Sequence, residues 1–432
     1  MTDLRRNRYS ISAGVGKSTY DSFGRFLNSP RRPFPSKFDS ENERTGFDFP
    51  WTPYGLDWLK QESSTKEWVA VGSLIEEPAN KIQILQVSNE ENGKPEVKKS
   101  LSTANDLEYP VTKLMWNPPS LNPNASTNLL ASTDQKLRIW NAPIDSESTG
   151  SLKCEAALST QGKTHSGAPL TSLDWCKADP SLIIVSSLDT TCTVWDVAAQ
   201  QSRTQLIAHD REVYDVAFIK DSMHVFVSVG ADGSVRMFDL RSLDHSTIIY
   251  EGDSNHWKRT GDTDGSAGNV SRPLVRLATC DADANLMATF HHKSSDIQMI
   301  DIRTPGVAYT NLSSLRGGDV NAVSWMPNSR SKLASCGDDS MVHIWDLSRP
   351  LSTSGTPARR GSNSVTPSGT TAPISEYGTP VPTAHSTGSS TENRFSPIGS
   401  RKFESEVNNI SWSGKQDSIA ALYGKSLELF SL

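Results

Sequence analysis

Apolar and polar residues alternate with a period of two in short segments that recur along most of the chain. Each segment is only a few residues long, and Gly, Pro, Asn, Asp or Ser usually bounds it. This pattern is typical of β-strands that bury one face and are joined by tight turns. The sequence therefore predicts an all-β protein.

The predicted strands form seven copies of a two-part signature. The first part is an alternating strand that usually ends in Trp, and it occurs at 54–58, 112–116, 171–175, 213–218, 275–280, 320–325 and 407–412. The second part is an apolar strand often followed by Asp, and it occurs at 82–85, 137–140, 193–196, 235–239, 297–301, 342–346 and 427–430. A further short strand lies between the two parts, as at 182–187, 225–230 and 332–337.

The spacing of these copies indicates how the sheets are arranged. The residues that end the first part, at positions 58, 116, 175, 218, 280, 325 and 412, are separated by 58, 59, 43, 62, 45 and 87 residues. The shortest separations match the ~40–45 residues of a WD repeat, and the longer ones require insertions. Because radial repetition hides most sheet edges, we expect a seven-bladed WD40 β-propeller.

The ring also needs a closing strand. The last copy ends at Leu432, directly after its third strand, so its fourth strand must come from elsewhere. The segment 45–51 precedes the first blade and can supply that strand. We expect this pairing to tie the two ends of the propeller together.

Three segments do not follow the strand pattern. Residues 1–44 and 349–395 are poor in apolar residues and rich in Ser, Thr, Pro and Gly, so they are expected to be disordered. The propeller then spans 45–432, with insertions at 252–270 and 349–395 that project from opposite rims. Proline-directed or basophilic phosphorylation is predicted at Thr356, Ser362, Thr366, Thr379 and Ser396.

A finer pattern predicts hydrogen bonds within blades. An Asp lies six residues before the terminal aromatic residue in four copies: Asp134/Trp140, Asp189/Trp195, Asp232/Phe238 and Asp339/Trp345. Ser228 and Ser335 lie four residues before that Asp, and His209 precedes the first strand of its copy. This arrangement resembles the structural network of WD repeats, in which His, Ser, Asp and Trp share hydrogen bonds. We interpret His209, Ser228 and Asp232 as part of that network rather than as a catalytic triad.

Composition and charge argue against several classes of function. The net charge is −6, and residues 1–40 carry a local balance of +5, so the rest of the chain is acidic and a poor surface for nucleic acid. The five cysteines form no CxxC pair, and no apolar run is long enough for a membrane span. The segment Gly14–Thr19 lacks the first glycine of a phosphate-binding loop, because Ile11 stands there. We expect no enzyme activity, metal or cofactor.

Several longer segments resemble one family. The segment 204–250, which contains TQLIAHDREVYDVAF, and the segments 49–58, 71–85, 109–118, 168–175, 186–195 and 408–412 are similar to the plant Transparent Testa Glabra proteins. They are also similar to the animal counterpart, a WD-repeat adaptor for DYRK-type kinases. This resemblance implies a non-catalytic scaffold, monomeric within larger complexes, for kinases and transcription regulators in the cytoplasm and nucleus. Blade five departs from the pattern, because Cys280 stands in place of Trp.

Two other functions remain as alternatives. Asp239 with Arg241, and Asp301 with Arg303, resemble the WDxR boxes with which substrate receptors bind the propeller adaptor of cullin-RING ubiquitin ligases. The second alternative is a hydrolase or nucleotide-dependent enzyme, for which the sequence contains no motif.

Overall fold

The computed structural model describes residues 46–60, 67–89, 95–103, 105–119, 128–144, 151–160, 167–252, 271–314, 316–349, 395–415 and 418–431. All of them belong to one compact unit, Lys37–Leu432. The predicted tail 1–44, and all but the end residues of the insertions 252–270 and 349–395, lie outside the described residues. In the described part of the chain, no helix is long and apolar enough to cross a membrane.

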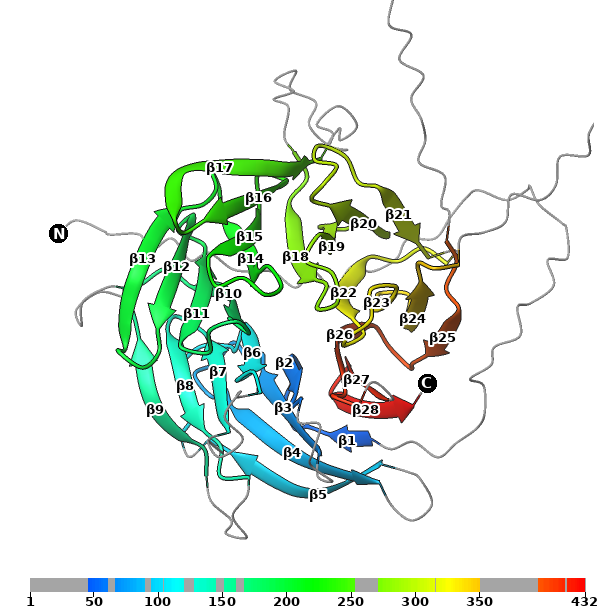
Figure 1. Ribbon diagram of the computed structural model, residues 1–432. Helices are drawn as coiled ribbons and strands as arrows, with labels where there is room; N and C mark the ends of the chain where they lie inside the picture. The colour runs from blue at the N-terminus through cyan, green and yellow to red at the C-terminus, as the bar shows by residue number, and fades with distance from the viewer. Residues whose placement is uncertain are drawn as a thin grey trace, which may run out of the picture. The chain divides into compact units, whose positions relative to one another are not determined.

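The described strands form seven antiparallel four-stranded sheets, arranged as blades around an axis (Figure 1). Blade 1 contains β2 (Pro53–Trp58), β3 (Glu67–Ser73), β4 (Ile82–Asn89) and β5 (Pro95–Ser102). Blade 2 contains β6 (Lys113–Trp116), β7 (Leu129–Thr133), β8 (Leu137–Asn141) and β9 (Lys153–Leu158). Blade 3 contains β10 (Leu170–Trp175), β11 (Leu182–Ser187), β12 (Thr191–Asp196) and β13 (Gln201–Ile207).

The remaining blades follow the same order from the axis outward. Blade 4 contains β14 (Val213–Phe218), β15 (Val225–Gly230), β16 (Ser234–Asp239) and β17 (Ser242–Glu251). Blade 5 contains β18 (Leu274–Thr279), β19 (Leu286–His291), β20 (Asp296–Asp301) and β21 (Thr310–Ser313). Blade 6 contains β22 (Val320–Trp325), β23 (Lys332–Gly337), β24 (Met341–Asp346) and β25 (Gly399–Lys402).

Blade 7 combines the two ends of the described chain. It contains β26 (Val407–Trp412), β27 (Ser418–Tyr423), β28 (Ser426–Ser431) and β1 (Gly46–Asp48). Phe47 of β1 pairs with Leu427 of β28, and the backbone N–H of Phe49 donates to Lys425 O at 2.8 Å. The predicted closing strand from the segment 45–51 is therefore confirmed, as is the seven-bladed all-β fold.

The core lies between blades, and no single sheet encloses it. Seven apolar clusters occur among the described residues, and each one joins two neighbouring blades. Because each sheet has neighbours on both faces, a middle strand such as β11 is buried throughout, whereas the outer strand β13 is mostly exposed. In blade 5, Cys280 stands where most blades have a Trp at the end of the inner strand. Cys280 packs in a cluster with Trp325 and Trp345 of blade 6, so the two blades remain in apolar contact.

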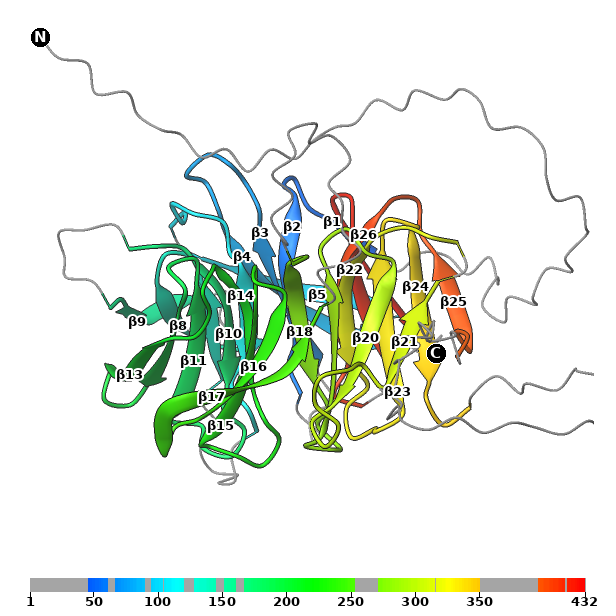
Figure 2. The same cartoon turned by 90° about the horizontal axis from the view of Figure 1, so that it is seen from above.

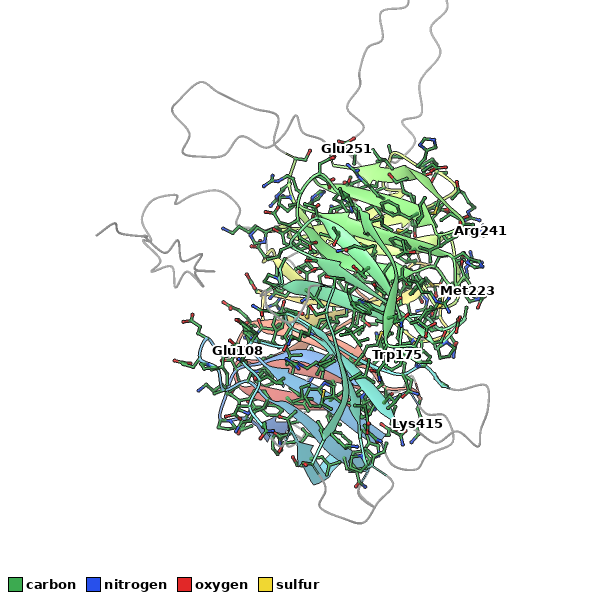
Figure 3. The ribbon with its side chains drawn as sticks, turned by 90° about the vertical axis from the view of Figure 1, so that its left-hand side faces the viewer. Glu108, Trp175, Met223, Arg241, Glu251 and Lys415 are labelled. Carbon is green, nitrogen blue, oxygen red and sulfur yellow. The ribbon has the colours of Figure 1, made fainter. Side chains whose placement is uncertain are left out.

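The two faces of the ring carry different connections. In blade 4, the turn after β14 and the turn after β16 lie together, because Leu240 N–H donates to His224 O at 2.8 Å. We call the face with these turns the AB face, and Arg241, Met223 and Lys415 lie on it, opposite Glu108 (Figure 3). The strands run from this face to the other, as the edge-on view shows (Figure 2).

Candidate functional site

Blade 4 contains the hydrogen-bond network around His209. Its Nδ1 lies 2.9 Å from Asp232 Oδ2, and its Nε2 lies 2.8 Å from Ser228 Oγ. Ser234 and Arg236 also donate to the Asp232 carboxylate, at 2.9 and 3.1 Å. Ser228 and His209 are fully buried, so the Ser228 hydroxyl has no exposed face for a substrate.

The charge of Asp232 is stabilised by its neighbours. Burial alone would raise the pKa of this carboxyl, but the hydrogen bond and charge of His209 and the donors of Ser234 lower the pKa to about 2. The Phe238 ring has no N–H to donate, unlike a Trp at this position, and instead stacks on Phe226, with ring centroids 5.0 Å apart. The network therefore links the segment before β14 to β15 and to the turn between β15 and β16.

Blade 6 forms a related network with a different histidine. Trp345 Nε1 donates to Ser335 Oγ at 2.9 Å, as the sequence pattern predicts. Asp339 Oδ2 lies 2.8 Å from Nε2 of His343, which comes from β24 and not from the segment before the blade. Ser314 also donates to Asp339, at 3.1 Å.

Blades 2 and 3 depart from the predicted network. Trp140 Nε1 donates to Ser132 Oγ at 2.9 Å, while Asp134 binds Arg138 Nε at 3.1 Å. The prediction that Trp195 joins such a network in blade 3 is wrong, since Asp189 accepts from Thr191 and the buried Trp195 Nε1 has no hydrogen-bond partner among the described residues. The reason is that Val185 occupies the position that Ser335 has in blade 6, and valine cannot accept a hydrogen bond.

The two Asp–Arg turns have the same geometry in neighbouring blades. Arg241 Nε lies 2.9 Å from Asp239 Oδ1 and its Nη2 lies 2.5 Å from Oδ2. Arg303 makes the same pair of bonds to Asp301, at 2.9 and 2.5 Å. The hydrogen bonds from Arg241 lower the pKa of Asp239 to about 2, and those from Arg303 also lower the pKa of Asp301. The two arginine side chains remain 65% and 59% exposed, so each guanidinium is fixed yet accessible on the AB face.

One predicted phosphorylation site lies in the described part of the chain. Ser396 is half-buried, follows the buried Phe395, and precedes Ile398, whose N–H donates to Ile344 O at 2.8 Å. Thr356, Ser362, Thr366 and Thr379 lie outside the described residues. Phosphorylation at these positions stays a prediction.

Comparison with known proteins identifies the relatives of this propeller. The family model for the WD domain, G-beta repeat, matches residues 157–196, 200–239 and 309–346. An uncharacterized WD repeat-containing protein of Schizosaccharomyces pombe is 60% identical over 437 residues, which cover 100% of both chains. A DDB1- and CUL4-associated factor 7 homolog of Dictyostelium discoideum is 39% identical over 302 residues, 70% of this chain and 84% of that protein.

The chain belongs to the family of WD-repeat proteins that includes these two relatives.

A WD repeat-containing protein of Saccharomyces cerevisiae is also similar, at 39% identity over 68% of this chain and 56% of that protein. The matched repeats begin one strand before each blade, as the range 200–239 shows, because it contains β13 of blade 3 and then three strands of blade 4. This offset is the reason that the WD-repeat ring needs β1 to complete its last blade.

The axial channel of this WD-repeat protein contains charged residues that the motif analysis did not identify. Asp57 Oδ2 accepts the Trp116 N–H at 2.8 Å, and Asp174 Oδ2 accepts the Phe218 N–H at 2.7 Å. Each aspartate thereby links the inner strand of one blade to the inner strand of the next. Burial raises the pKa of both carboxyls, that of Asp174 to about 6. The sequence Leu-Asp-Trp occurs at both 56–58 and 173–175, and this repetition could have identified the two aspartates.

Three further contacts cross the channel between blades that are not neighbours. Lys113 of blade 2 lies 3.6 Å from Asp215 of blade 4. Arg276 of blade 5 donates to the Tyr54 hydroxyl of blade 1 at 2.6 Å. Lys177, after β10, bonds Asp281, after β18. The channel is therefore divided by side chains, with Lys177 and Asp281 at its mouth on the AB face.

Proposed function

We propose that this WD-repeat protein is a non-catalytic scaffold that joins protein kinases and transcription regulators in the cytoplasm and nucleus. The proposal rests on the resemblance to Transparent Testa Glabra proteins and on the surface of the AB face. The observation that carries it is the matched pair of Asp–Arg turns, in which two exposed guanidiniums are held in fixed positions. An arginine whose rotamer is already fixed loses less conformational entropy when a partner binds it.

The burial of the His209 network supports the non-catalytic part of the proposal. His209 Nε2 and the Ser228 hydroxyl are already hydrogen-bonded to each other. Both side chains are fully buried, which leaves no room for a substrate at the hydroxyl. Any turnover that Asp232→Ala removed without unfolding the protein would contradict this view and would revive the enzyme alternative.

A second function is favoured by the same turns. The Dictyostelium relative is named as a DDB1- and CUL4-associated factor. We propose, as the alternative, that Arg241 and Arg303 bind a DDB1-type adaptor and that the chain is a substrate receptor of a cullin-RING ligase. Both functions use the AB face, and they differ in the identity of the partner.

A double substitution tests ligase docking, and the identity of the proteins that co-purify separates the two functions. Arg241→Ala with Arg303→Ala should abolish co-purification of a DDB1-type adaptor and leave the melting temperature unchanged, because exposed ion pairs contribute little to stability. Arg203→Ala is the matched control, since Arg203 binds Asp196 at 2.7 Å in the adjacent blade but does not follow it by two residues. Equal recovery of the adaptor with both variants would reject ligase docking. Absence of any kinase or transcription regulator from the purified wild-type complexes would reject the scaffold.

A further inference from the structure

The mouth of the channel on the AB face contains a cavity of about 340 Å³. Turns of all seven blades contribute to it, and its charged residues are Lys60, Lys177, Lys220, Asp174, Asp221 and Asp281. Its walls also include Pro119, Phe218 and Pro327. A volume of this size corresponds to roughly ten water molecules, which is space for a long amino-acid side chain.

Two of the carboxylates at this mouth have fixed positions. Asp174 belongs to the inner strand β10, and the Phe218 N–H donates to it across the blade interface at 2.7 Å. Asp281 follows the inner strand β18 directly, and its short side chain is only 32% exposed. Burial raises the pKa of Asp174, so the surrounding cations do not fully compensate its charge. Because both side chains are short and lie on or directly after inner strands, the two carboxylates stay at the cavity wall.

The lysines at the mouth are different, because their charges lie at the ends of long flexible stems. The Lys177 ammonium is bonded to Asp281 from two blades away, and its side chain is 47% exposed. Lys60 and Lys220 also stabilise the charge of Asp281, although neither forms the direct contact. A lysine that is half exposed can move its ammonium into water at small cost, since an exposed ion pair contributes about 1 kcal/mol or less.

The channel continues below the mouth as a second cavity of about 200 Å³, which two side-chain contacts cross. Lys113 and Asp215 meet across it at 3.6 Å, and Arg276 reaches Tyr54 from the opposite wall. Asp215 precedes Phe218 by three residues on β14, so this contact lies deeper than Asp174. A side chain that enters from the AB face therefore meets Asp174 and Asp281 before it reaches these two contacts.

We propose that this mouth binds one arginine side chain of a basic partner segment, whose guanidinium replaces the Lys177 ammonium between Asp174 and Asp281. The planar fork of arginine donates in two directions and so suits two separate carboxylates better than a lysine does. The negative charge of the whole chain, −6, favours the approach of a basic segment. None of these residues belongs to the Asp–Arg turns, so separate substitutions can test this site and ligase docking.

The test uses the purified full-length protein and fluorescein-labelled pentapeptides of the form Gly-Gly-X-Gly-Gly, with X as Arg, Lys, Gln or Glu. Fluorescence anisotropy at low salt should show binding of the Arg peptide, weaker binding of the Lys peptide, and none of the Gln or Glu peptide. Asp281→Asn and Asp174→Asn should each weaken the Arg peptide about tenfold or more. Asp210→Asn is the matched control, because Asp210 is 81% exposed and does not line the cavity, so the affinity of this variant for the Arg peptide should equal that of the wild type.

Lys177→Met provides a second readout that loss of folding cannot imitate. Removing the competing ammonium should tighten the Arg peptide by about threefold or more. The proposal is overturned if Asp281→Asn and Asp174→Asn bind the Arg peptide as wild type does, or if no Arg peptide binds at up to about 5 mM. It is also overturned if the Glu peptide is preferred and Lys177→Met abolishes its binding, because the lysines would then form an anion site.

Discussion

Replacing Asp232 tests whether the His209 network stabilises the propeller through charge. The Asp232 side chain is only 13% exposed, so solvent screens its contacts little. Its pKa lies at about 2 in the folded protein and at 3.8 in a model peptide. By linkage this difference corresponds to roughly 2.5 kcal/mol of folding free energy at pH 7. We expect Asp232→Asn to lower the free energy of unfolding by about that amount.

The pH dependence distinguishes a charge effect from a loss of packing. Because the folded-state pKa is the lower one, the stabilisation is fully present above pH 3.8 and is lost as the pH falls through about 2. The difference between wild type and Asp232→Asn should therefore fall to about half at pH 3. Urea unfolding followed by tryptophan fluorescence at pH 7 and pH 3 measures it.

The control for this experiment is Asp221→Asn. Asp221 is 80% exposed and lies in a turn of the same blade, so its replacement should change stability by no more than about 0.5 kcal/mol at either pH. If the difference between wild type and Asp232→Asn were the same at both pH values, the electrostatic explanation of the network would be refuted.

Two further predictions concern packing and ring closure. Trp345 is fully buried, so Trp345→Ala should cost about 3–5 kcal/mol in urea unfolding. Trp345→Phe should cost less, about 1–2 kcal/mol, because blade 4 has Phe238 at that position and the change removes the bond to Ser335 and only part of the indole volume; equal costs would contradict this reasoning. A chain that begins at Pro50 lacks β1 and the buried Phe49, so it should melt at a lower temperature and associate through the open edge of β28. Light scattering and thermal melts would show this, and a chain that begins at Thr45 should behave as the full chain does.

The local hydrogen-bond patterns could be predicted only where the sequence contained every partner. The spacing of Ser335, Asp339 and Trp345 was sufficient for the Trp345 bond, but it did not show that His343 would bind Asp339. The Asp189 and Trp195 spacing was misleading, since the acceptor position there is Val185. A spacing rule finds one pair of residues, whereas a network requires all of its members to be compatible.

The sequence by itself determined the number of blades, the strands and the closing segment. The blades and their strands depend on contacts between residues near in the chain, and period-two alternation and tight turns record such contacts directly. The closing pair Phe47 and Leu427 is far apart in the chain, and the sequence indicated it only because the last copy lacks a fourth strand. Only the tertiary structure decided which charges meet in the channel. Lys113 and Asp215, or Arg276 and Tyr54, are far apart in the chain and belong to blades that are not neighbours. Ring closure brings them together, and no local pattern records a distance across the axis.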